Sequence, residues 1–203
     1  MEQLEIFYNS FPEERFLYTK ILTFLLSAPS IFIDKQKFAR QFNLSSVKFD
    51  QFFDRLEALS VGERVYQYPT ESLILNPIEH FKFYFYDFDL FNNQVFRMDQ
   101  EGSLLEQKFF SYFRQKSDLF LFTYRTKESL EIDFIIQRED GSIDLIEIKK
   151  DQFIYAGDFG NMLSFDKEII KQKNLFVLHN GERDKKEGKI FVIPLNKYIN
   201  DFI

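Results

Sequence analysis

The chain has 203 residues, enough for one domain of good size or two small ones, each able to bury a core. Its formal net charge of −6 argues against affinity that comes mainly from phosphate neutralisation, and the absence of cysteine excludes disulfides and thiolate metal sites. No apolar run reaches the roughly 18 residues that a membrane span needs, and the acidic N-terminus does not resemble a signal peptide. We therefore expect a cytoplasmic protein without a membrane partner.

The N-terminal part shows helical periodicity followed by strand-like alternation. Asp34 is the expected N-cap of the second helix, and Ser45 or Ser46 that of the third. Three helices followed by strands outline a winged helix, so we predict a winged-helix-like domain over residues 1–95. The expected helices cover 13–25, 34–41 and 47–59, and the expected strands lie within 63–75 and 81–87.

The third of these helices does not look like a reader of DNA. Its polar positions, from Lys48 to Glu57, mix acids and bases with no basic excess. A helix that enters the major groove needs basic and amide side chains with a basic surround. We therefore favour protein docking or a linker role for this domain.

The residue pattern of the C-terminal part predicts a helix, three strands, a helix and a strand around a mixed central sheet. This αβββαβ order defines a second domain over residues 96–203, and the chain as a whole is α+β or α/β. Residues 151–160 and 181–188 are expected loops, and Asp144 is expected to be exposed. The predicted helices cover 102–116 and part of 161–172, and the strands cover 120–125, 131–137, 143–149, 174–179 and 189–194.

The centre of this domain is a β-hairpin, and its strand register determines which residue lies opposite Asp133. A two-residue loop, Asp140-Gly141, places Asp133 opposite Ile148. A three-residue loop, residues 139–141 with Gly141 in a left-handed conformation, instead places Asp133 opposite Glu147. We predict the three-residue loop. The two carboxylates then repel each other by about 0.5 kcal/mol or more, so a metal ion or Lys149 is expected beside them.

Asp133 followed by Glu147-Ile148-Lys149 resembles the D…ExK signature of the PD-(D/E)XK nuclease superfamily. More narrowly, the chain is similar to the nuclease-like C-terminal domain of prokaryotic AAA+ ATPases, in which a winged-helix segment comes first. No P-loop string is present, so we expect no ATP hydrolysis, and the chain is either a stand-alone relative or a fragment. The words that carry the resemblance are GSLLE at 102–106, YRT at 124–126, EIDF at 131–134 and IEIK at 146–149.

The resemblance implies a restriction-endonuclease-like fold and a site that cuts DNA with Mg²⁺ or Mn²⁺. Hard cations of this kind take oxygen ligands, and they activate water for phosphodiester hydrolysis. The implied roles are Asp133, Glu147 and the Ile148 carbonyl as metal ligands, Glu106 as a further acidic ligand, Lys149 as the group that positions water, and Arg125 as a phosphate contact.

A simpler interpretation of the same residues is structural. Glu131–Lys149 and Asp133–Arg125 are then ion pairs on a half-exposed sheet, each contributing about 0–1 kcal/mol. His80 and His179 are expected to be structural, because no second histidine or cysteine stands at metal-ligand spacing. Under this alternative the nuclease-like fold is an inactive binding or assembly module, with an ATPase or another protein as partner in place of DNA.

Overall fold

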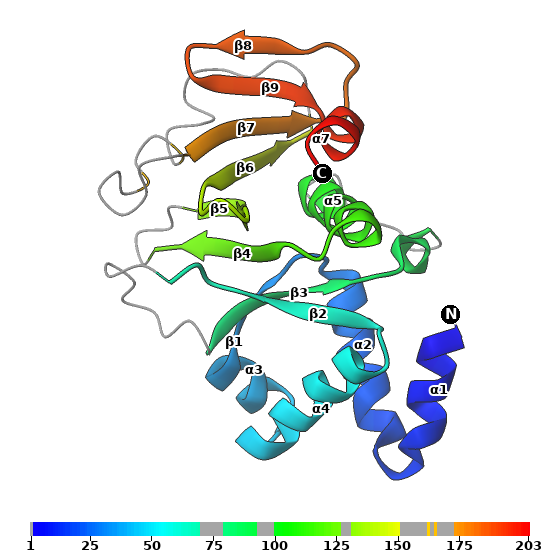
Figure 1. Ribbon diagram of the computed structural model, residues 1–203. Coiled ribbons are helices and arrows are strands. Elements are labelled where there is room, and N and C mark those ends of the chain that lie inside the picture. The colour runs from blue at the N-terminus through cyan, green and yellow to red at the C-terminus, as the bar shows by residue number, and fades with distance from the viewer. Residues whose placement is uncertain are drawn as a thin grey trace. The chain divides into compact units, whose positions relative to one another are not determined.

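The computed structural model describes residues 2–69, 79–92, 100–126, 131–150, 162, 165 and 173–203 (Figure 1). It is a mixed α/β structure, as predicted, with a three-stranded and a six-stranded sheet. Two compact units are present, Met1–Val65 with Ile78–Ser111, and Tyr66–Pro77 with Tyr112–Ile203. The division after residue 95 stays a prediction. In the described residues, none of the helices is both long enough and apolar enough to cross a membrane.

The first unit consists of helices around a small sheet with the strand order β1-β3-β2. The predicted caps are confirmed, because the Asp34 carboxylate accepts the Lys37 N–H at 3.0 Å and Ser45 Oγ accepts the Lys48 N–H at 3.2 Å. Of the two strands predicted within 63–75, the structure describes the first, and residues 70–75 lie outside the described residues. The elements are α1 (Glu2–Ser10), η1 (Pro12–Glu14), α2 (Arg15–Ser27), β1 (Phe32–Asp34), α3 (Lys35–Gln41), α4 (Ser46–Ala58), β2 (Gly62–Tyr66), β3 (His80–Phe85) and η2 (Phe88–Phe91).

Phenylalanine fills the core of the first unit. Phe53 of α4 contacts Phe81 and Phe83 of β3, with ring centroids 5.2 and 5.3 Å apart. Phe52 contacts Phe7 of α1 edge to face at 5.8 Å. Edge-to-face packing of this kind adds about 0.5–1.5 kcal/mol per pair to area burial, which explains the use of many phenylalanines in a core without tryptophan.

Helix α5 (Glu101–Lys116) contributes residues to both units. In the first unit its Phe110 stacks on Tyr84 at 4.9 Å, and the buried Gln107 side chain bonds the backbone of Phe85 through both its oxygen and its nitrogen. The predicted helix 102–116 is therefore confirmed, with Phe109 and Phe113 buried as expected.

The second unit contains the six-stranded sheet, in the order β4-β5-β6-β7-β9-β8 (Figure 1). The pairs β4–β5, β5–β6 and β8–β9 are antiparallel, whereas β6–β7 and β7–β9 are parallel. This confirms a mixed sheet. The elements are β4 (Phe120–Arg125), β5 (Glu131–Gln137), β6 (Ile143–Lys149), β7 (Lys173–His179), β8 (Lys185–Glu187), β9 (Ile190–Pro194) and α7 (Leu195–Asp201).

Three features of the second unit differ from the predictions or lie beyond them. The charged segment 181–188, expected to be a loop, contains β8, and the chain continues past β9 into the unpredicted helix α7. The predicted loop 151–160 lies outside the described residues, as does the predicted helix within 161–172 except for Met162 and Phe165, which belong to a core cluster.

The prediction that Asp144 is exposed was wrong. Asp144 is fully buried, and its carboxylate accepts hydrogen bonds from Arg138, from the Tyr198 hydroxyl at 2.6 Å and from the Asn174 amide at 2.8 Å. Helix α7 covers this face of the sheet, with Tyr198 4.8 Å from the Phe176 ring. A buried carboxylate is tolerated because these donors replace its lost hydration.

Candidate functional site

The β5–β6 hairpin has the predicted register. The Arg138 N–H donates to Ser142 O at 2.9 Å, the Gly141 N–H donates to Arg138 O at 3.0 Å, and Gly141 has a φ of 80°. The strands then pair from Gln137–Ile143 to Phe134–Ile146. This confirms the three-residue loop. One residue beyond the last of these pairs, the two strands reach Asp133 and Glu147.

Asp133 occupies an irregular position in β5. Between β4 and β5 the register shifts, so that Tyr124 pairs with Ile132 while Phe122 pairs with Ile135. Two β5 residues therefore face the single residue Thr123, which is a β-bulge. The Asp133 side chain is only 8% exposed, and its Oδ2 accepts the Ile148 N–H of β6 at 2.7 Å. The bulge thus aims a carboxylate at the neighbouring strand.

Glu147 and Lys149 lie two residues apart on β6 and therefore on one face of the sheet. Glu147 is 7% exposed, and its Oε1 accepts a hydrogen bond from Lys149 Nζ at 2.9 Å. The expected cation beside the carboxylates is thus present in the form of Lys149.

Arg125 ends β4 at the same edge of the sheet. It pairs with Glu131 in the strand register, and its guanidinium lies 3.7 Å from Glu131 Oε2. Its backbone N–H donates to the buried Gln67 side chain at 2.9 Å. Four predicted residues, Arg125, Asp133, Glu147 and Lys149, are therefore brought to one end of three adjacent strands.

Glu106 has a different set of contacts. It belongs to the first unit, where its Oε2 accepts hydrogen bonds from Lys82 Nζ at 2.8 Å and from the Tyr84 hydroxyl at 3.1 Å. Lys82 is only 2% exposed. The sequence does carry a signal for this pair, because a lysine inside the aromatic run FKFYF of β3 needs a buried acid as its partner.

The oxygen chemistry of Asp133 and Glu147 fits a hard divalent cation. Mg²⁺ is held in proteins through one or two carboxylates, with water and substrate phosphates as its other ligands, and the Ile148 carbonyl adds a further oxygen on the same strand. Within the described part of the chain, no group of three or more His, Cys, Asp or Glu side chains is placed to hold a metal ion.

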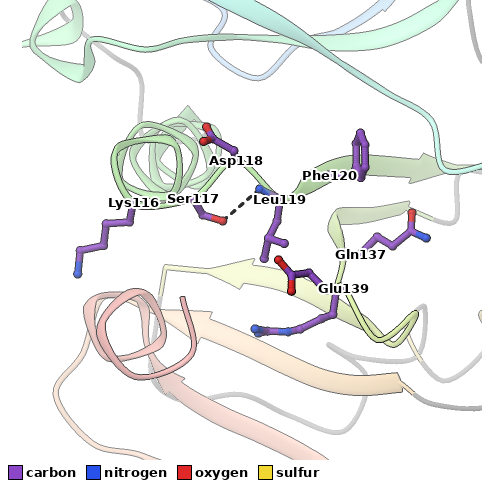
Figure 2. A pocket seen from close by; sticks show the side chains of 8 residues that line it. Lys116, Ser117, Asp118, Leu119, Phe120, Gln137 and Glu139 are labelled. Carbon is purple, nitrogen blue, oxygen red and sulfur yellow. Dashed lines mark hydrogen bonds between the residues drawn. The ribbon is translucent and has the colours of Figure 1, made fainter.

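A separate pocket of about 580 Å³ lies at the turn end of the same hairpin, which is the opposite end from Asp133 (Figure 2). Figure 2 shows the segment after α5 on one side, where Ser117 Oγ accepts the Leu119 N–H at 3.2 Å, and Gln137 and Glu139 on the other. None of the predicted site residues lines this pocket. Its lining residues are Lys116, Ser117, Asp118, Leu119, Phe120, Gln137, Arg138 and Glu139.

Comparison with known proteins gives one match. Residues 101–198 match the model of a family described as a domain of unknown function (DUF4143), which is found in AAA-ATPase-associated proteins. No curated protein and no solved structure gives a significant match. The matched range includes Glu106, Arg125, Asp133, Glu147 and Lys149. The match agrees with the expected relation to AAA ATPases and contains nothing specific to nucleases.

Proposed function

We propose that this chain hydrolyses phosphodiester bonds of DNA at the Asp133–Glu147–Lys149 end of the hairpin, with Mg²⁺ or Mn²⁺ as cofactor. The observation that carries the proposal is the placement of two nearly buried carboxylates at adjoining strand ends, with Lys149 bonded to one of them. Like charges side by side in a sheet repel each other, and burial of each carboxylate adds a desolvation cost. A bound divalent cation would relieve the repulsion between the two carboxylates.

The proposed roles are those that the resemblance to PD-(D/E)XK nucleases implies for these residues. Asp133 and Glu147 would hold the cation, and its chemistry there would be polarisation of the phosphate and activation of water. The Asp133–Ile148 hydrogen bond fixes the first carboxylate before any ligand arrives. Lys149 orients the attacking water and offsets charge on the phosphate, and Arg125 contacts a neighbouring phosphate oxygen.

The proposed fold supports these roles. In the second unit an antiparallel hairpin is followed by parallel strands, and β6 carries Glu147 and Lys149 in the sheet interior, which supports the proposal of a PD-(D/E)XK domain. The order α2, β1, α3, α4, β2, β3 in the first unit supports the proposal of a winged helix. We assign these two fold names as part of the proposal.

The test is cleavage of a fluorescently labelled DNA duplex and single strand in the presence of Mn²⁺. Glu147→Gln and Lys149→Met are expected to lower the rate by at least 100-fold, since each removes a group from the reacting centre. The matched control is Asp118→Asn/Glu139→Gln, which removes exposed carboxylates at the pocket end of the hairpin. Equal rates for wild type and Glu147→Gln would refute the proposal.

A second candidate is a binding module for an AAA ATPase, and the charges on α4 favour it. Both basic residues of that helix, Lys48 and Arg55, contact Glu14, at 3.7 and 2.7 Å. The helix therefore offers phosphates no surplus positive charge. A stoichiometric complex with an AAA ATPase that persists in Asp133→Asn, seen by light scattering, together with undetectable cleavage, would favour this candidate.

A further inference from the structure

His179 is the last residue of β7 and the parallel partner of Lys149. Partners in a parallel pair lie on the same face, on strands about 4.8 Å apart. His179 therefore extends the row formed by Glu147 and Lys149 by one strand. It is only 1% exposed, and it is not one of the residues of the proposed reaction.

The contacts of His179 fix the position of its proton. The Gly181 N–H donates to Nδ1 at 2.9 Å, so Nδ1 carries a lone pair. Burial, aided by the nearby Lys185 charge, lowers the pKa of His179, although the Arg183 backbone opposes the shift. The ring is therefore neutral, with its hydrogen on Nε2. A protonated Nε2 donates hydrogen bonds and does not ligate a metal ion.

This Nε2–H group is buried and makes no hydrogen bond to any of the described residues. A buried donor without an acceptor costs roughly 1–3 kcal/mol. The cost is recovered when a ligand supplies an oxygen, so such a group favours ligands that carry an acceptor over those that do not.

We propose that His179 is a further substrate-contacting residue of the site, donating its Nε2–H to a phosphate oxygen that binds beside Lys149. A phosphate fits because its oxygens are strong acceptors and because the neighbouring Lys149 adds an ammonium charge. The inference rests on the proposed function, whose substrate supplies the phosphate.

Two variants of His179 test the roles of its two ring nitrogens separately. His179→Asn keeps an acceptor at the position of Nδ1 for the Gly181 N–H and removes Nε2. His179→Gln keeps an N–H donor at the distance of Nε2 and gives up the acceptor. His80→Asn, in the first unit, is the matched control.

The probe is thymidine 5′-monophosphate, titrated with and without Mg²⁺ while the histidine ring signals are followed by ¹H–¹⁵N NMR. In wild type we expect the His179 Nε2–H signal to shift as the probe saturates. One charged hydrogen bond corresponds to about a 10-fold change in Kd or more. We expect His179→Asn to weaken binding by that factor, His179→Gln by less, and His80→Asn not at all.

The inference is overturned if the Nε2–H signal of wild type does not move at saturation, or if His179→Asn binds the probe as wild type does. Failure of the proposed function looks different. Mn²⁺ binding and cleavage could be absent while the probe still shifts the Nε2–H signal without metal. That result would support the phosphate contact and refute the hydrolytic role. If His179→Asn fails to fold, the wild-type signal alone decides.

Discussion

Asp133 Oδ2 accepts the backbone N–H of Ile148 at 2.7 Å, so a candidate metal ligand also completes the hydrogen bonding between β5 and β6. Removing the carboxyl group leaves a buried amide without an acceptor. We expect Asp133→Ala to lower the free energy of unfolding by about 1–3 kcal/mol. Asp133→Asn keeps an acceptor and should cost less than about 1 kcal/mol. Urea unfolding at pH 7 measures both, and equal stability of the two variants would contradict this account of the hydrogen bond.

The buried Lys82–Glu106 pair gives a prediction for the first unit. Breaking a buried ion pair from one side costs about 3–5 kcal/mol, because the remaining charge stays buried. We therefore expect Lys82→Met to lower the free energy of unfolding by that amount. In Lys82→Met/Glu106→Gln no charge is left uncompensated, so the double variant should be more stable than Lys82→Met alone. Unfolding of wild type, Lys82→Met and the double variant tests this, and a double variant no more stable than Lys82→Met would speak against it.

Buried tyrosines make the fold sensitive to alkaline pH. Burial, followed by the Asp144 carboxylate, raises the pKa of Tyr198 well above its ordinary value, and burial raises the pKa of Tyr18 to about 12. A group whose pKa is raised by folding contributes stability below its unfolded pKa of about 10, and that stability is lost as the pH rises further.

We therefore expect the free energy of unfolding to fall between pH 10 and 12. The slope should be up to about 1.4 kcal/mol per pH unit for each such group. Tyr198→Phe should show a shallower loss than wild type over this range. Urea titrations at several pH values provide the measurement, and an equally steep loss in Tyr198→Phe would show that another group is responsible.

The hairpin loop depends on the backbone of Gly141. A Cβ at this position meets nothing within 4 Å, so the cost of a substitution is conformational and comes from the φ of 80°. We expect Gly141→Ala to lower the free energy of unfolding by about 1–2 kcal/mol and Gly141→Asn by less, because asparagine tolerates the left-handed region. Chemical denaturation distinguishes them. A neutral Gly141→Ala would mean that the loop adopts another conformation in solution.

Local signals were sufficient to predict the centre of the second unit. Alternating apolar residues in β5 and β6 with a glycine at the turn specify both strands, and the loop length then sets the register. Asp34 and Ser45 predicted helix starts for the same reason, since a cap bonds an amide three residues away.

Features that depend on distant partners were not predictable in this way. Strand β8 carries the charged sequence KKE and has no apolar pattern, because among the described strands it lies at the sheet edge and pairs with β9 alone. Asp144 looked exposed because its three donors come from positions 138, 174 and 198. Likewise, Glu106 meets Lys82 only once α5 packs on β3.

The central claim is that Asp133 and Glu147 hold a divalent cation, and isothermal titration with Mn²⁺ tests it most directly. Wild type and the control Asp118→Asn/Glu139→Gln should both show saturable binding, whereas Asp133→Asn/Glu147→Gln should show none. Repeating the titration with a phosphorothioate-protected oligonucleotide supplies the substrate oxygens that complete the metal shell. Equal Mn²⁺ binding by wild type and Asp133→Asn/Glu147→Gln would contradict the claim. The absence of a binding heat in both proteins with the oligonucleotide present would contradict it as well.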